Sequence, residues 1–188
     1  MRKRDIVIVI LAVTASLSAC GANSDSNGTE VAMTANPDSD FNDADVKFAQ
    51  EMTARHEQAV ELADLALATS AYASTQVIDL AQRIKNAQGP EIEMMKGWLT
   101  GWNMPMEMSG MSHSSGMMSG DEMASLKNLT YGEFDKKWLE LMIKHHQGAI
   151  AMATDMKSTA KSSDILMLAD QIISGQKTEI AEMQLLLK

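Results

Sequence analysis

The sequence predicts an all-α protein in which two similar helical hairpins pack together as a four-helix bundle. Three observations support this fold class. Hydrophobic residues make up 45% of the chain, aromatic residues only 4%, and there are three prolines, a composition typical of helical proteins. Apolar residues recur at helical spacing along four long stretches. The first two stretches also resemble the last two, which indicates a duplicated hairpin.

The N-terminal segment 1–20 is predicted to be an export signal. Basic residues at 2–4 precede an apolar run at 6–13 that is too short to be a comfortable membrane span. The sequence LSAC at 17–20 resembles the bacterial lipobox, where cleavage leaves Cys20 as a lipidated N-terminus. We therefore expect a lipid anchor that holds the protein at the outer face of the cytoplasmic membrane, or at the periplasmic face in a double-membrane cell. The alternative is an ordinary signal peptide with a chance cysteine.

The rest of the chain suits one domain on a tether. Residues 21–41 are small, polar and rich in turn formers, which predicts a flexible tether. The four-helix-bundle domain then occupies 42–188. It divides into a hairpin at 42–100, a Met-rich loop at 101–129 and a second hairpin at 130–188.

The apolar stripes give the four helices approximate bounds of 42–69, 75–98, 130–157 and 163–187. Asn42 or Asp43 can cap the first helix. Thr130 and Glu133 fit a capping box at the start of the third. Pro90 is expected to kink or interrupt the second helix, because proline lacks the backbone N–H that a helix interior uses.

The two hairpins repeat with an offset of about ninety residues. Met52 and His56 in the first correspond to Met142 and His146 in the second. Both hairpins also carry the motif Gln-x-x-Glu-Ile-x-x-Met, at 88–95 and 176–183. Two amphipathic hairpins bury their apolar stripes best against each other, and a pseudo-twofold bundle of this kind can bring the two Met/His pairs near each other.

The third predicted helix carries a cluster of candidate metal ligands. At about 100° per residue, five side chains fall within an arc of about 120°: Met142, His145, His146, Met152 and Met156. Imidazole and thioether are the ligands that Cu(I) prefers. The alternative is that these methionines fill the core and that the histidines are buried and hydrogen-bonded. The first hairpin has Arg55 where the second has His145, so the two copies are unequal.

The loop between the hairpins is unusually rich in methionine. Of the 17 methionines, seven lie between residues 104 and 123. Six of them surround His113, namely Met104, Met106, Met108, Met111, Met117 and Met118. Exposed methionine risks oxidation, and a loop is expected to offer no core that could bury six. The spacing suits a flexible segment that wraps thioethers around a soft cation. The alternative is a sticky linker or an apolar flap over the bundle.

Charge and motif content exclude several classes of function. A net charge of −9 argues against nucleic-acid binding. A single cysteine excludes an internal disulfide and Cys-rich zinc sites. We find no motif for nucleophilic catalysis or phosphate binding, and no Glu-x-x-His motif of a di-iron oxidase, so we expect no enzyme activity. The alternatives are a bundle that binds haem non-covalently, a metal-dependent redox bundle, and a surface interaction module without metal.

Several stretches resemble the domain-of-unknown-function-305 family. They are MIKHHQGAIAMA at 142–153, a weaker copy MTARHEQAVELA at 52–63, and WLTGW at 98–102. The resemblance covers about 42–187 and implies an exported, ferritin-like four-helix bundle, with members that bind copper or silver through Met and His. The ligands that it implies here are Met142, His145, His146 and Met152, and more weakly Met52 and His56. Arg55 departs from the family pattern.

Together these patterns predict an extracytoplasmic lipoprotein of copper homeostasis or resistance. It would sequester Cu(I), with Ag(I) or Cu(II) as further candidate ions, or pass copper to a partner protein. Imidazole ligands are expected to lose affinity for the ion as they protonate near pH 6.5. Thioether ligands do not protonate, so the loop should hold Cu(I) at lower pH.

Overall fold

The structure is a computed structural model that describes residues 39–107 and 116–188. Within these ranges it consists of five α-helices and contains no strand, so the predicted all-α class is confirmed. The helices are α1 (Asp43–Leu67), α2 (Thr75–Gly101), α3 (Gly120–Lys127), α4 (Tyr131–Met156) and α5 (Ser163–Leu186). The predicted signal segment with Cys20, most of the tether, and the loop residues Met108, Met111 and His113 lie outside the described residues.

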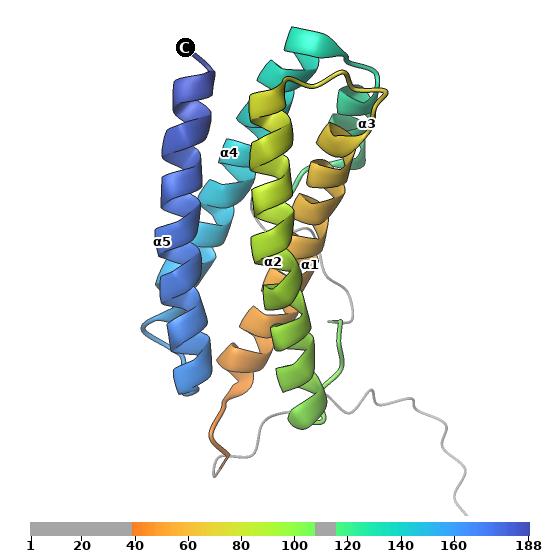
Figure 1. Cartoon of the computed structure of the whole chain (residues 1–188). Helices are drawn as coiled ribbons and strands as arrows, with labels where there is room; N and C mark the ends of the chain where they lie inside the picture. The colour runs from red at the N-terminus through yellow and green to blue at the C-terminus, as the bar shows by residue number, and fades with distance from the viewer. Residues whose placement is uncertain (1–38, 108–115) are drawn as a thin grey trace, which may run out of the picture. The chain divides into compact units, whose positions relative to one another are not determined.

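Helices α1, α2, α4 and α5 form the predicted four-helix bundle (Figure 1). The most extensive contacts lie within each hairpin, between α1 and α2 and between α4 and α5. The α1–α4 packing joins the two hairpins, whereas α2 and α5 approach each other only sparsely. Neighbouring helices run antiparallel, so α1 and α4 point in opposite directions. None of the described helices is long and apolar enough to cross a membrane.

The start of α1 is capped by Asn42, one of the two predicted cap residues, through a capping box with Asp45. The side chain of Asn42 accepts a hydrogen bond from the Asp45 backbone at 3.0 Å, and the Asp45 carboxylate accepts one from the Asn42 backbone at 2.8 Å. Asp45 is fully buried and also accepts from the backbone N–H of Ser162, the N-cap of α5, at 3.1 Å. One carboxylate therefore ties the beginnings of α1 and α5 together.

The capping box predicted at Thr130 and a break of the helix at Pro90 are both contradicted by the structure. Thr130 is the N-cap of α4 but its side chain makes no capping hydrogen bond. Tyr131 instead adopts a φ of 55°, stacks on Tyr72 and donates its N–H to the Ala71 carbonyl at 2.9 Å. Helix α2 continues without interruption through Pro90. Pro90 is exposed, so water can solvate the carbonyl that would otherwise have received its N–H.

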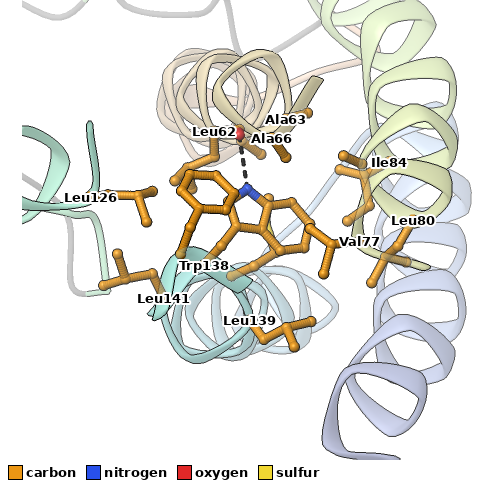
Figure 2. Packing of buried hydrophobic residues seen from close by; sticks show 14 of the residues in the cluster. Leu62, Ala63, Ala66, Val77, Leu80, Ile84, Leu126, Trp138, Leu139 and Leu141 are labelled. Atoms are coloured by element: carbon orange, nitrogen blue, oxygen red, sulfur yellow. Dashed lines mark hydrogen bonds between the residues drawn. The ribbon is translucent and has the colours of Figure 1, made fainter. Parts of the chain in front are cut away.

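The core consists of two apolar clusters. In the first, Trp138 is fully buried and donates its indole N–H to the Leu62 carbonyl at 2.8 Å (Figure 2). Leu126 of α3 packs against the same cluster. Helix α3 lies inside the segment predicted to be a loop, and it forms because Met123 and Leu126 bury their side chains in this cluster. The second cluster includes Phe48, Met95 and Leu168.

Candidate metal centre

A layer of buried polar side chains lies between the two apolar clusters. On each of the four bundle helices these residues stand in sequence between members of the first cluster and members of the second. The polar layer comprises Arg55, His56, Gln88, His145, His146 and Gln176, each at most 4% exposed. Burying such groups costs free energy unless they find partners, so the layer marks a candidate functional site.

Two of the histidines are held by carboxylates on the neighbouring helix of the same hairpin. His56 Nε2 lies 2.7 Å from Glu91 Oε2, and His146 Nε2 lies 2.7 Å from Glu179 Oε2. The Nδ1 atom of each ring is buried and has no hydrogen-bond partner in the described part of the chain. A buried N–H without a partner costs about 1–3 kcal/mol, so we assign the hydrogen to Nε2, which donates to the carboxylate. Nδ1 then carries a free lone pair in each ring.

His145 is the least satisfied residue of the layer. Both of its ring nitrogens are buried, and neither has a hydrogen-bond partner among residues 39–107 and 116–188. Burial, and then the nearby charge of Arg55, hold the pKa of His145 well below its ordinary value of 6.5. The ring is therefore neutral in the folded protein at neutral and mildly acidic pH. The expectation that imidazole protonation near pH 6.5 controls this site is wrong for His145.

Arg55 occupies the layer beside His145, to which it corresponds in the repeat. Its Nη1 donates to the backbone carbonyl of His145 at 3.1 Å, and its Nε donates to the Met152 sulfur at 3.2 Å. Burial lowers the pKa of Arg55, and the charge of Glu51 acts in the opposite direction. The guanidinium remains charged in the pH range of interest because its ordinary pKa is so high. It is a fixed positive charge next to a candidate thioether ligand.

The structure divides the predicted methionine ligands between the two sides of the polar layer. Met142 is buried in the cluster around Trp138, whereas Met52 and Met156 are buried in the other cluster. Met142 and Met156 stand fourteen residues apart on α4, which is about 21 Å along the helix axis. The methionines of α4 share one helix face, but a single ion cannot contact all of them.

The two described parts of the Met-rich loop, 101–107 and 116–129, are both bound to α1. Gln50 Nε2 donates to the Pro105 carbonyl at 2.7 Å. Gln58 Nε2 donates to the Met118 carbonyl at 3.0 Å, and the Met118 N–H donates to Gln58 Oε1 at 2.9 Å. In the second part, a Cβ atom added to Gly116 would lie only 3.3 Å from Gly148 Cα and 3.5 Å from Arg55 Nη1. The loop therefore meets α4 directly beside the polar layer.

The described loop methionines are less exposed than the sequence predicted. Met118 is 2% exposed and belongs to the first cluster, while Met104 packs against the second. Met117 is partly buried. Of the five loop methionines that the structure describes, only Met106 is largely exposed, at 41%. The loop does have a core to pack against, so part of its methionine content serves packing.

The described residues contain no group of three His, Cys, Asp or Glu side chains placed to hold a metal ion. A site there would need thioether or amide donors. The sequence analysis identified the layer's histidines but missed the roles of Glu91, Glu179 and Arg55. The repeated Gln-x-x-Glu motif was the signal that could have found the two carboxylates, because a polar motif repeated at core positions is not explained by packing.

Comparisons with known structures give the fold several relatives. The crystal structure of a DUF305 fragment from Deinococcus radiodurans matches with a TM-score of 0.70 and 31% identity, and covers 82% of this chain and 98% of that one. A DUF305 protein from Streptomyces coelicolor matches with a TM-score of 0.69 and 31% identity, and covers 74% and 89%.

A third relative is CopM in its Cu(I)-bound form. It matches with a TM-score of 0.64 and 30% identity, and covers 74% of this chain and 92% of that one. CopM has also been solved in Cu(II)-bound and Ag-bound forms. No curated protein sequence matches this chain significantly. The family model named Domain of unknown function (DUF305) matches residues 45–187, and the chain therefore belongs to the DUF305 family.

Proposed function

We propose that this protein binds Cu(I) outside the cytoplasm, through imidazole nitrogens of the polar layer and methionine sulfurs around it, and that it sequesters the ion or hands it on. One observation carries this proposal. Four buried imidazole nitrogens of His56, His145 and His146 have no hydrogen-bond partner in the part of the chain that the structure describes. A bound soft cation would supply a partner for the ring nitrogens that carry a lone pair, which is one nitrogen in each neutral imidazole, because Cu(I) accepts imidazole and thioether ligands together.

The histidines are prepared for metal binding. A metal-ligating histidine typically donates its second ring N–H to a carboxylate, which fixes the ring and its tautomer. Glu91 and Glu179 stand in this relation to His56 and His146. An imidazole must also be neutral before it can bind a metal, and the low pKa of His145 meets this condition.

The charges around the layer favour a cation. Glu91 and Glu179, which hold two of its histidines, carry two negative charges, whereas Arg55 carries one positive charge that lies near the negative charge of Glu51. A bound cation would reduce this negative excess. The relatedness to CopM, which has been solved with Cu(I), Cu(II) and Ag, supports the same ions.

The proposed ligands fall into three groups. His145 and Met152 lie together beside Arg55. His56 and His146 present their Nδ1 atoms within the layer, with Met52, Met142 and Met156 in the flanking clusters. The loop supplies further sulfur and imidazole donors, which are Met104, Met106, Met108, Met111, His113, Met117 and Met118. A lipid on Cys20 would keep this binding domain at the membrane surface, and the proposed role requires no catalysis.

An anaerobic Cu(I) titration against a chromogenic Cu(I) chelator tests the proposal. We expect the protein to retain at least one Cu(I) per chain and the variant His145→Ala to lose roughly tenfold or more in affinity. The matched control is Met167→Ala, which removes a thioether that is 58% exposed on α5. It should bind as the wild type does. The proposal fails if the chelator strips all Cu(I) from the wild type, or if His145→Ala binds Cu(I) as tightly as the control.

A further inference from the structure

A second polar site lies between α2 and α5, where the two helices pack sparsely. It is a cavity with about 40 Å³ of water-accessible space. Its polar lining consists of Gln88 and Glu91 from α2 and Gln171, Gln176 and Glu179 from α5. The Gln-x-x-Glu motif of each hairpin thus supplies one half of the lining.

The carboxamide groups of two buried glutamines line this cavity, and their hydrogen-bonding atoms have no partners in the described part of the chain. Gln88 is 2% and Gln176 is 4% exposed. In the described ranges neither the oxygen nor the nitrogen of either amide has a hydrogen-bond partner. Leaving such groups unpaired costs free energy, so the cavity needs an occupant that can interact with them.

The charge of the lining selects a positively charged occupant. Each carboxylate receives one hydrogen bond from a histidine of the polar layer, at 2.7 Å. A carboxylate has about four acceptor positions, so each of these two carboxylates can still accept further hydrogen bonds or bind a cation. As far as the structure describes the chain, no Lys or Arg lines this cavity. Glu91 and Glu179 therefore give it negative charge with no basic residue in the lining to compensate.

The donor atoms select the class of cation. The two carboxylates and two carboxamides offer oxygen, which suits Mg²⁺, Ca²⁺ and Mn²⁺, and the lining contains no sulfur. The two carboxylates do not form a compact group with a third His, Cys, Asp or Glu side chain within the described residues. Mg²⁺ in particular commonly keeps several waters and binds through one or two carboxylates. A cavity of 40 Å³ admits such waters, since each needs roughly 10–15 Å³.

We propose that this cavity binds a partly hydrated divalent cation of the oxygen-preferring class, held by Glu91, Glu179 and the side-chain carbonyls of Gln88 and Gln176. This site is distinct in chemistry from the Cu(I) site and does not depend on it. The two sites adjoin at the His–Glu pairs, whose carboxylates line the cavity, and Gln88 and Gln176 belong both to the polar layer and to the cavity lining. The chain would then hold a soft ion and a hard ion on opposite sides of the same pairs.

Mn²⁺ is the probe that tests this site, because its electron paramagnetic resonance signal separates free from bound ion. We expect the full chain to bind one Mn²⁺, and Glu91→Gln with Glu179→Gln to weaken binding roughly tenfold or more. Glu93→Gln is the matched control, since Glu93 is an exposed carboxylate of the same helix and does not line the cavity. His145→Ala should leave Mn²⁺ binding intact while it weakens Cu(I) binding, so the two sites can fail independently.

A second variant covers the case in which the double variant does not fold. Gln176→Leu removes one unsatisfied amide and fills its space with an apolar group, so the protein should stay folded and still lose Mn²⁺ affinity. One bound Mn²⁺ that is sensitive to either variant supports the site. Absence of Mn²⁺ binding at millimolar ion, or equal binding by wild type and folded variants, overturns it.

Discussion

Replacing Arg55 with leucine should strengthen Cu(I) binding. Arg55 Nε lies 3.2 Å from the Met152 sulfur, and a metal–sulfur bond is about 2.3 Å long. An ion bound to that sulfur would thus lie within about 5.5 Å of a fixed positive charge. At about 5 Å and an effective dielectric constant near 20, the repulsion is about 3 kcal/mol. Removing this repulsion should raise the affinity for Cu(I) about a hundredfold. Water that enters the site, or movement of the side chains, would reduce this gain toward tenfold.

The same substitution should leave the fold intact. The hydrogen-bond partners of Arg55 at His145 and Met152 are a carbonyl oxygen and a thioether, both neutral. The substitution therefore leaves neither of these two groups as an unpaired buried charge, which is what makes the loss of one partner of a buried ion pair strongly destabilising.

The assay is the anaerobic competition titration, run beside circular dichroism. Lys127→Leu, which removes an exposed positive charge of α3, is the control for a general effect of net charge. If folded Arg55→Leu binds Cu(I) no more tightly than this control, the charge of Arg55 does not limit Cu(I) binding. Weaker binding would show instead that Arg55 positions the ligands.

Three further predictions concern stability, each measured by urea unfolding. The pKa of His145 is lowered in the folded state, so the unfolded chain binds the proton first as pH falls. The free energy of unfolding should therefore decrease below about pH 6.5, by up to about 1.4 kcal/mol per pH unit. His145→Leu should lack this pH dependence, and an unchanged dependence of stability on pH in that variant would contradict the prediction. Trp138→Phe should cost about 2 kcal/mol, from the lost bond to Leu62 and the space left by the smaller ring, and a loss below about 0.5 kcal/mol would argue against a tight cluster. Asp45→Ala should cost about 3 kcal/mol because it frees donors at the starts of two helices; equal stability would show that those donors find water.

The main helices could be predicted because their signals are local. The apolar spacing and the Asn42 cap depend on residues within one or two turns, and the bundle follows from the repeat. Helix α3 could not be predicted in this way. Its eight residues, Gly120–Lys127, depend on distant partners around Trp138. The left-handed backbone of Tyr131 likewise depends on contacts with residues 71 and 72, far away in sequence.

The candidate site was predicted in composition but not in arrangement. The repeat suggested that the pairs Met52/His56 and Met142/His146 would lie together. Met52 and Met142 each stand four positions before a histidine of the layer. Because α1 and α4 are antiparallel, these two methionines lie toward opposite ends of the bundle. The histidines therefore share the polar layer while Met52 and Met142 lie in different clusters. Helix direction, which no local pattern encodes, decides which ligands can meet.

The unequal residues Arg55 and His145 have a consequence for how such a protein can be built. Two separate, identical hairpins assembled as a symmetric dimer would have to present the same side chain at both positions. With arginine at both positions, two positive charges would repel each other inside the bundle. With histidine at both positions, the layer would contain no fixed positive charge. Fusing both halves into a single polypeptide removes the symmetry requirement, so one half can carry the ligand and the other a charge that, together with burial, keeps it deprotonated.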